Sequence, residues 1–477
     1  MMDSKVIERQ RRLFSIVDEF FQRATGDDVS TFAARGAFDE VVRERATFLG
    51  RRGSSAYTWF EQQLRSLYSE TWRDVFRDAR NTGGMKLVLG GSSRFSGSHF
   101  ASVRKMLLYA DSILIPDPLL PWLETERKEE RFRHVNLLEQ SFWLLHLKPL
   151  VDVDLPYPAV LVFPSWEKGL EERDAITQEG QFALTAAVVG HHLGYRFGHL
   201  DELKAFAIDH SSEFLEGVDK ARLFLAPGAD SPEPLEIGIR RYWDHVRTWR
   251  TEEHVASLKQ FPESVLVLYA IMERLGPQYH LLENAEELAG QPMMCVEAHW
   301  YYHKLIAQTF EGQLVSQGSL SPNTIAVLRS LDRPAHEWLG NVPMSSLVDM
   351  RRNNENEQFR KRLAAHTADL HTAALDDLDR VAAEVGRGIA GLVADHKNEV
   401  RRIADTYGLK HVQTLAGGVV TAAALFAPAL APFVGGLHAP VAIAGRYAHT
   451  KMQERLEKGR AARSLTGVLA LAYDQRN

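Results

Sequence analysis

The sequence contains a single cysteine, Cys295, so no disulfide can form within the chain. One free cysteine is typical of proteins kept in a reducing compartment. The first twenty residues are charged and amphipathic and lack the apolar core of a secretory signal, so we expect a cytosolic protein. The net charge of −6 disfavours nucleic acid as a partner, and none is expected.

Three common catalytic signatures are also missing. No Gly-x-Ser-x-Gly elbow marks a serine nucleophile, no glycine-rich loop ends in the Lys-Ser/Thr of a P-loop, and no dinucleotide fingerprint occurs. No repeat of solenoid length is found either. The sequence therefore identifies no reaction and no cofactor, and it favours a role other than catalysis.

Hydrophobic residues make up 45% of the chain and charged residues 25%, as in folded globular proteins, and 477 residues exceed one ordinary core. We predict a mainly α, multi-helix protein with a small inserted parallel βαβαβ unit and a C-terminal long helix followed by an apolar helical hairpin. The predicted regions are a helical region (1–82), the α/β unit (83–165), a helical domain (166–345), a long amphipathic helix (346–410), the apolar hairpin (411–445) and a basic helix (446–477).

The α/β unit is predicted from three short apolar runs. Met85–Leu89 is followed by glycines, whereas Ser112–Ile115 and Ala159–Phe163 are each closed by a proline. Proline cannot donate a hydrogen bond to a neighbouring strand. Helix-like segments separate the runs, and strands that alternate with helices at this spacing indicate a parallel sheet.

A long proline-free segment runs from Met350 to about Thr406. Apolar residues such as Phe359 and Leu363 recur there mostly at spacings of three, four and seven, which predicts a long amphipathic helix or an imperfect coiled coil. Three glycines between residues 386 and 391 weaken that helix by about 1 kcal/mol each and make a kink plausible.

The segment 411–445 contains no Asp, Glu, Lys or Arg. It exceeds the ~20 residues of one bilayer crossing and falls short of two. Prolines at its centre would break a helix, and paired glycines on either side would let two helices pack closely. The candidate membrane or interface residues are Gly417, Gly418, Phe426, Pro428, Pro432, Phe433, Gly435, Gly436, Arg446 and Lys451.

Basic residues flank this segment on both sides. Residues 397–463 carry ten basic and four acidic side chains, a local charge of +6. That arrangement favours keeping both ends on the cytosolic face and attracts anionic lipid. A buried hairpin within a helical bundle is an equally weighted alternative, because apolar arms of about 10–14 residues are more often core helices. Burial in one state and release in another would satisfy both interpretations.

The loop after the first predicted strand is the best candidate for a ligand site. Its glycines allow backbone N–H groups to converge, and a helix that starts near Ser98 would direct its positive end there. Gly-Ser loops of this kind also occur without any ligand. The candidate residues are Gly90, Gly91, Ser92, Ser93, Arg94 and Ser98, with Asp117 after the second strand, although Pro116-Asp117-Pro118 also reads as a turn.

His299 and His303 are spaced by four residues, which places both imidazoles on one helical face, as a metal pair requires. The segment is not an HExxH motif, because Trp300 stands where the glutamate belongs. Aromatic residues between the histidines favour a packed helix instead. Histidines that hydrogen-bond locally are the expected outcome.

Three functions remain open from the sequence. The first is a cytosolic effector of bacterial type, in anti-phage defence or toxin-like, with a sensing body and a membrane-active C-terminal hairpin that associates conditionally with the inner membrane. The second is a soluble oligomeric scaffold, in which 411–445 binds a partner subunit. The third is an enzyme that binds a nucleotide or phosphoester through the α/β unit.

Overall fold

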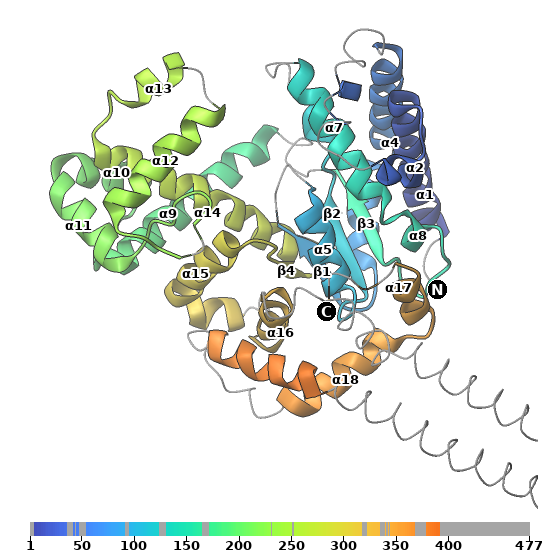
Figure 1. Cartoon of the computed structure of the whole chain (residues 1–477). Helices are drawn as coiled ribbons and strands as arrows, with labels where there is room; N and C mark the ends of the chain where they lie inside the picture. Colours follow the sequence, from blue (N-terminus) through green and yellow to red (C-terminus); the bar gives the residue numbers. More distant parts are fainter. Residues whose placement is uncertain are drawn as a thin grey trace, which may run out of the picture.

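A computed structural model of the chain describes residues 4–35, 42, 44–46, 54–90, 95–123, 130–164, 171–229, 231–249, 252–316, 322–333, 339, 342, 344–367 and 378–391. The predicted apolar hairpin and the basic helix after it lie outside these residues, and so do the candidate residues from Gly417 to Lys451. Within the described residues, helices surround one small sheet (Figure 1), which confirms the predicted fold class.

The sheet has four parallel strands in the order β3-β2-β1-β4. Three of them confirm the predicted runs: β1 (Lys86–Leu89), β2 (Ser112–Pro116) and β3 (Val160–Phe163). The fourth strand, β4 (Gln291–Met293), pairs with β1 from about 200 residues further along the chain, and no sequence signal predicted it. The sheet is therefore completed by a segment from outside 83–165.

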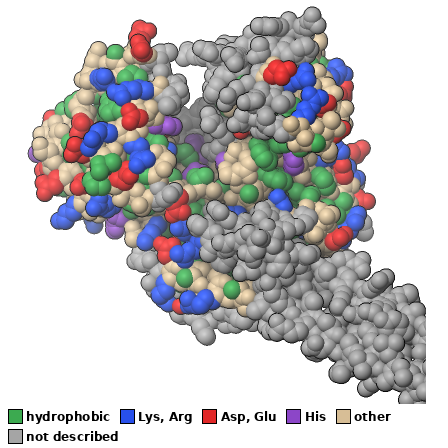
Figure 2. Space-filling model, viewed as in Figure 1, with side chains coloured by type: hydrophobic (Ala, Val, Ile, Leu, Met, Phe, Trp, Pro, Cys, Tyr) green, Lys and Arg blue, Asp and Glu red, His purple; other side chains and the backbone are tan. Residues whose placement is uncertain are grey.

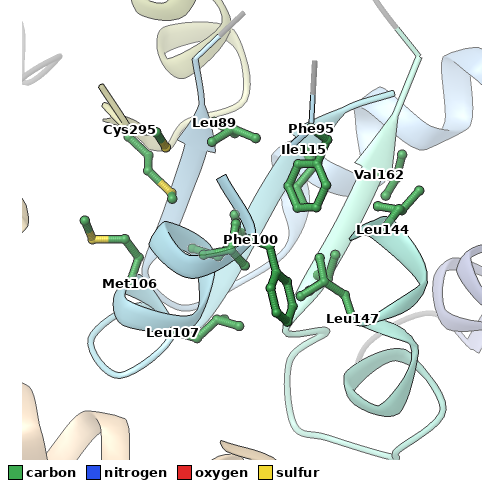
Figure 3. Close-up of a cluster of buried hydrophobic side chains, with 14 of the residues drawn as sticks. Leu89, Phe95, Phe100, Met106, Leu107, Ile115, Leu144, Leu147, Val162 and Cys295 are labelled. Carbon is green, nitrogen blue, oxygen red and sulfur yellow. The ribbon is translucent and has the colours of Figure 1, made fainter. Parts of the chain in front are cut away.

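Both faces of the sheet are buried, as expected of parallel strands with continuous apolar sequences. Leu89, Ile115 and Val162 point to one face, where side chains of α5 such as Phe100 and Met106 join them (Figure 3). The alternate strand residues, with Phe163 among them, pack against α1, α4 and the end of α14 on the other face.

The helices of this α/β body precede, connect or follow the first three strands. They are α1 (Ser4–Thr25), α2 (Val29–Ala34), α4 (Ser54–Asn81), α5 (Gly97–Met106), α6 (Leu120–Leu123), α7 (Glu130–Leu145) and α8 (Lys148–Val151). Their buried side chains and those of the strands belong to one contiguous core, so the N-terminal helices pack against the sheet.

A helical lobe lies beside the α/β body (Figure 1) and has its own core. It consists of α9 (Glu171–Leu193), α10 (Leu200–Asp209), α11 (Ser211–Ala221), α12 (Leu235–Trp249), α13 (Glu252–Leu258), α14 (Glu263–Glu287) and α15 (Glu297–Ser316). The Gly276-Pro277 pair, which reads as a break in the sequence, lies inside α14. Burial along most of that helix outweighs the cost of one proline.

The C-terminal described elements pack below the sheet and the lobe (Figure 1). They are α16 (Pro322–Asp332), α17 (Met344–Arg352), α18 (Glu355–Thr367) and a helical stretch at 378–391. The predicted continuous helix from Met350 is interrupted between α17 and α18, where Asn354 has a φ of 56°. Among the described helices, none is both long and apolar enough to cross a membrane.

Gln10 of α1 closes the edge of the sheet. Its Nε2 donates to the carbonyl oxygen of Val162 at 2.9 Å, and its Oε1 accepts from the N–H of Val162 at 2.9 Å. One side chain thus replaces the neighbouring strand that β3 lacks. These two backbone groups of Val162 are therefore not free to pair with another chain.

We expect Gln10→Leu to lower the free energy of unfolding by about 1–3 kcal/mol, because the buried N–H and C=O of Val162 lose their partners. Urea unfolding measures the change. Gln22→Leu is the matched control on the same helix, since Gln22 is exposed and its side chain donates to Asp18, one turn earlier, at 3.2 Å. Equal losses in the two variants would contradict the assigned role of Gln10.

Candidate functional site

The direction of the strand order changes at β1, and the carboxyl ends of β1 and β4 lie side by side there. From β1 the chain continues through α5 to β2 on one side, whereas β4 lies on the other side. In open parallel sheets, ligands gather in the crevice outside the strand ends at such a reversal. Gly90, which follows β1, lies at this point and donates its N–H to Met293 O of β4 at 3.2 Å.

Gly90 is packed closely from the lobe side. A Cβ at this position would lie 3.3 Å from Leu281 of α14 and 3.5 Å from His299 Nδ1 of α15. The structure therefore brings together two features that are unrelated in the sequence, the glycine loop and the histidine pair. Figure 2 shows a recess between the helical lobe and the α/β body in which hydrophobic and histidine side chains are visible.

Helix α5 begins at the same edge, after Ser96. The Ser96 hydroxyl lies 2.8 Å from Ser98 Oγ and 2.8 Å from His99 Nδ1, which also accepts the Ser96 N–H at 3.3 Å. The first turn carries no acidic residue, so its positive end is not neutralised by its own sequence. The remaining loop candidates, residues 91–94, lie outside the described residues.

Gln140 of α7 supports this loop and was not found by sequence reasoning. Its Oε1 accepts the N–H of Phe95 at 3.0 Å, and the side chain is buried. The Nε2 atom has no hydrogen-bond partner within the described part of the chain. A polar residue inside an otherwise apolar helix face was the available signal, but helical spacing alone does not show which loop it meets.

Asp117 lies at the end of β2 in a buried turn. Its Oδ1 accepts the N–H groups of Leu119 at 2.7 Å and Leu120 at 3.2 Å, and its other oxygen accepts the Tyr68 hydroxyl. Burial raises the pKa of Asp117, and burial together with the nearby carboxylate raises the pKa of Tyr68. With three donors and 3% exposure, this carboxylate starts α6 and faces the protein.

Within the part of the chain that the structure describes, no third ligand joins the histidine pair on α15. No group of three His, Cys, Asp or Glu side chains suited to a metal occurs among the described residues. His303 is 1% exposed, and neither ring nitrogen has a hydrogen-bond partner within that part of the chain. Burial lowers its pKa to about 4, so His303 is neutral at physiological pH.

A second polar cluster lies at the turn between α5 and β2, and we call it the Asp111 cluster: Asp111, Arg351, Asn356 and Arg360. Asp111 accepts the N–H of Met85 at 2.6 Å, Asn356 Nδ2 at 2.5 Å and Arg360 Nη2 at 3.0 Å, and Arg351 Nη1 lies 3.5 Å away. Burial raises the pKa of Asp111, but these donors and cations outweigh it and lower the pKa below its usual value.

The same side chains also bind the backbone of the turn after α5. Arg360 donates to Tyr109 O at 2.5 Å, and Arg351 donates to Ala110 O at 3.1 Å and to Asp111 O. Buried backbone carbonyl groups of a turn require hydrogen-bond donors, which these side chains supply. Three side chains of α17–α18 thus bind the turn between α5 and β2, and the sequence contained no sign of this contact.

A small apolar pocket occurs elsewhere in the described structure. It lies between α1, α8 and the amino end of β3, where Ile7, Leu150 and Val160 contribute to its walls and Gln10 is its polar residue. It lies at the β3 edge of the sheet, whereas the glycine loop follows β1, and it offers no cluster of polar groups for chemistry.

Comparisons of this chain with protein-family models, with curated proteins and with solved structures found no match.

Proposed function

We propose that the protein is a conditional effector, in which the α/β body and the helical lobe sense a ligand and the segment 411–445 acts on a membrane. The segment supports this proposal because it is uncharged, has central prolines and is flanked by basic residues. A chain with a net charge of −6 that concentrates +6 around one apolar segment favours contact with an anionic surface there.

The Asp111 cluster is the observation that carries the proposal. Helices α17 and α18 lead toward 411–445 along the chain, and this cluster docks them on the turn that joins α5 to β2. The amino end of α5 lies at the reversal of strand order, where a ligand is expected. One ten-residue helix therefore connects the candidate ligand edge with the elements that precede the apolar segment.

Flotation with vesicles of phosphatidylethanolamine and phosphatidylglycerol tests the membrane activity. We expect the full-length protein to float after activation, for example by cell extract from an infected or stressed host, and the protein with 411–445 deleted to remain at the bottom. Phe426→Asp with Phe433→Asp keeps the length of the segment but adds charge. Each aspartate is expected to reduce insertion by about 100-fold.

The control for these variants is the hydrogen–deuterium exchange of β1–β3, which should be unchanged because the altered residues follow the docked helices in the sequence. The membrane role fails if full-length protein and deletion variant stay with the soluble fraction under every activating condition. An oligomeric scaffold would then be the better interpretation, and the sedimentation coefficient of the two proteins would reveal it.

A further inference from the structure

The Asp111 cluster buries more charge than stable packing alone requires. The side chains of Asp111 and Arg351 are 5% and 3% exposed, and that of Arg360 is 21% exposed. Burying ion pairs is costly, and apolar residues of similar size often stabilise a protein equally well or better. An ion cluster requires a specific geometry of all its members. The whole contact is therefore weakened when one charged partner is lost.

The polar part of the contact is local to one turn. All the acceptors lie on Tyr109, Ala110 and Asp111, and all the C-terminal donors lie on three residues of α17–α18. Phe359 is fully buried, and its ring lies 6.3 Å from that of Tyr109. Leu347, Met350 and Leu363 of α17–α18 are also buried in the core that includes the strands, and α17 packs against α8. The Asp111 cluster is thus the polar centre of a larger apolar contact.

A side chain of α5 itself also binds the segment just before α17. Arg104, in the last turn of α5, donates to the carbonyl oxygen of Val342, just before α17. A small displacement of α5 along its axis would therefore disturb the backbone contact at Val342 and the Asp111 cluster together. Bistable docking contacts of this kind convert small shifts at one site into release at another.

We infer that the Asp111 cluster is an autoinhibitory latch, which holds α17–α18 on the α/β body and so restrains the apolar segment that follows them in sequence. This inference rests on the proposed function and names its regulation. Ligand binding at the amino end of α5 shifts the helix, the cluster opens, and the C-terminal part of the chain is released.

Hydrogen–deuterium exchange on the full-length protein tests the latch without a membrane. Arg351→Met and Arg360→Met each leave a buried carboxylate without one of its cations. We expect amides of 344–367 to exchange about 100-fold faster in both variants, while amides of β1–β3 keep their wild-type rates. Arg360→Met is the gentler variant, because Arg360 is partly exposed, and it preserves the test should Arg351→Met fold poorly.

Arg352→Met is the matched control. Arg352 is the next residue on α17, is 56% exposed and pairs only with the half-exposed Asp349. Its loss should change neither the exchange of 344–367 nor vesicle binding. The latch is overturned if the two cluster variants exchange 344–367 at the wild-type rate, or if their exchange rises equally throughout the sheet.

Vesicle flotation of the same variants separates the two proposals. We expect Arg351→Met and Arg360→Met to bind phosphatidylglycerol vesicles at least about tenfold more than wild type without activation, and deletion of 411–445 to abolish the gain. Fast local exchange without any vesicle binding would overturn the membrane role and support the dock. Vesicle binding by activated wild type, with slow exchange in both variants, would support the membrane role and overturn the latch.

Discussion

The wild-type protein is expected to lose about 3 kcal/mol of unfolding free energy between pH 6.5 and pH 4 that a His303→Leu variant retains. Burial lowers the pKa of His303 from 6.5 to about 4. In that interval the unfolded chain binds a proton at His303 that the folded chain does not. The stability that the neutral His303 contributes above pH 6.5 is therefore lost as the pH falls. Each unit by which folding lowers its pKa corresponds to about 1.4 kcal/mol.

Urea unfolding at a series of pH values measures this difference. At pH 7.5, His303→Leu should be neutral or slightly stabilising, because it removes a buried imidazole whose nitrogens lack partners in the described structure. His199→Leu is the control: His199 is exposed and its side chain does not cap α10. Parallel pH profiles for wild type and His303→Leu would show that His303 is hydrogen-bonded or accessible.

The second large effect concerns α1 and α4, the N-terminal helices that pack against the sheet. Phe60→Ala is expected to lower the free energy of unfolding by about 3–5 kcal/mol, because Phe60 is fully buried and stacks on Phe20 with ring centroids 4.2 Å apart. Since both rings belong to the core that includes the strands, the loss should appear in the transition that unfolds the sheet.

Phe261→Ala is the matched control, because Phe261 is 50% exposed and its truncation should cost less than about 0.5 kcal/mol. Hydrogen–deuterium exchange identifies which elements open together. If Phe60→Ala released α1 and α4 while the strands kept their protection, residues 1–82 would be an independent module and the single-core description would be wrong.

The first three strands were predictable because the sequence signal for them is local. Each is a run of four or five mostly apolar residues with a glycine or proline directly after it, and burial on both faces favours that composition. β4 is different. It has three residues, one of them proline, and exists because α14 returns the chain to the edge of β1.

The candidate site was only partly predictable for the same reason. Gly90 and Ser98 could be placed after a strand and near a helix start, since both positions follow from neighbouring residues. Three contacts of the site connect residues 45 to 240 positions apart. They are the packing of His299 on Gly90, the hydrogen bond from Phe95 to Gln140, and the hydrogen bonds of Arg351 to the turn at Asp111. No periodicity within one segment encodes such contacts.

By itself the sequence determined the mainly helical class, three parallel strands, the glycine loop and an uncharged segment at 411–445, because composition and period act within a few residues of one another. Only the tertiary structure decided the strand order, the fourth strand, the neutral His303 and the docking of α17–α18 by buried charges. Those features depend on which distant side chains share a low-dielectric interior, and that is settled when the whole chain packs.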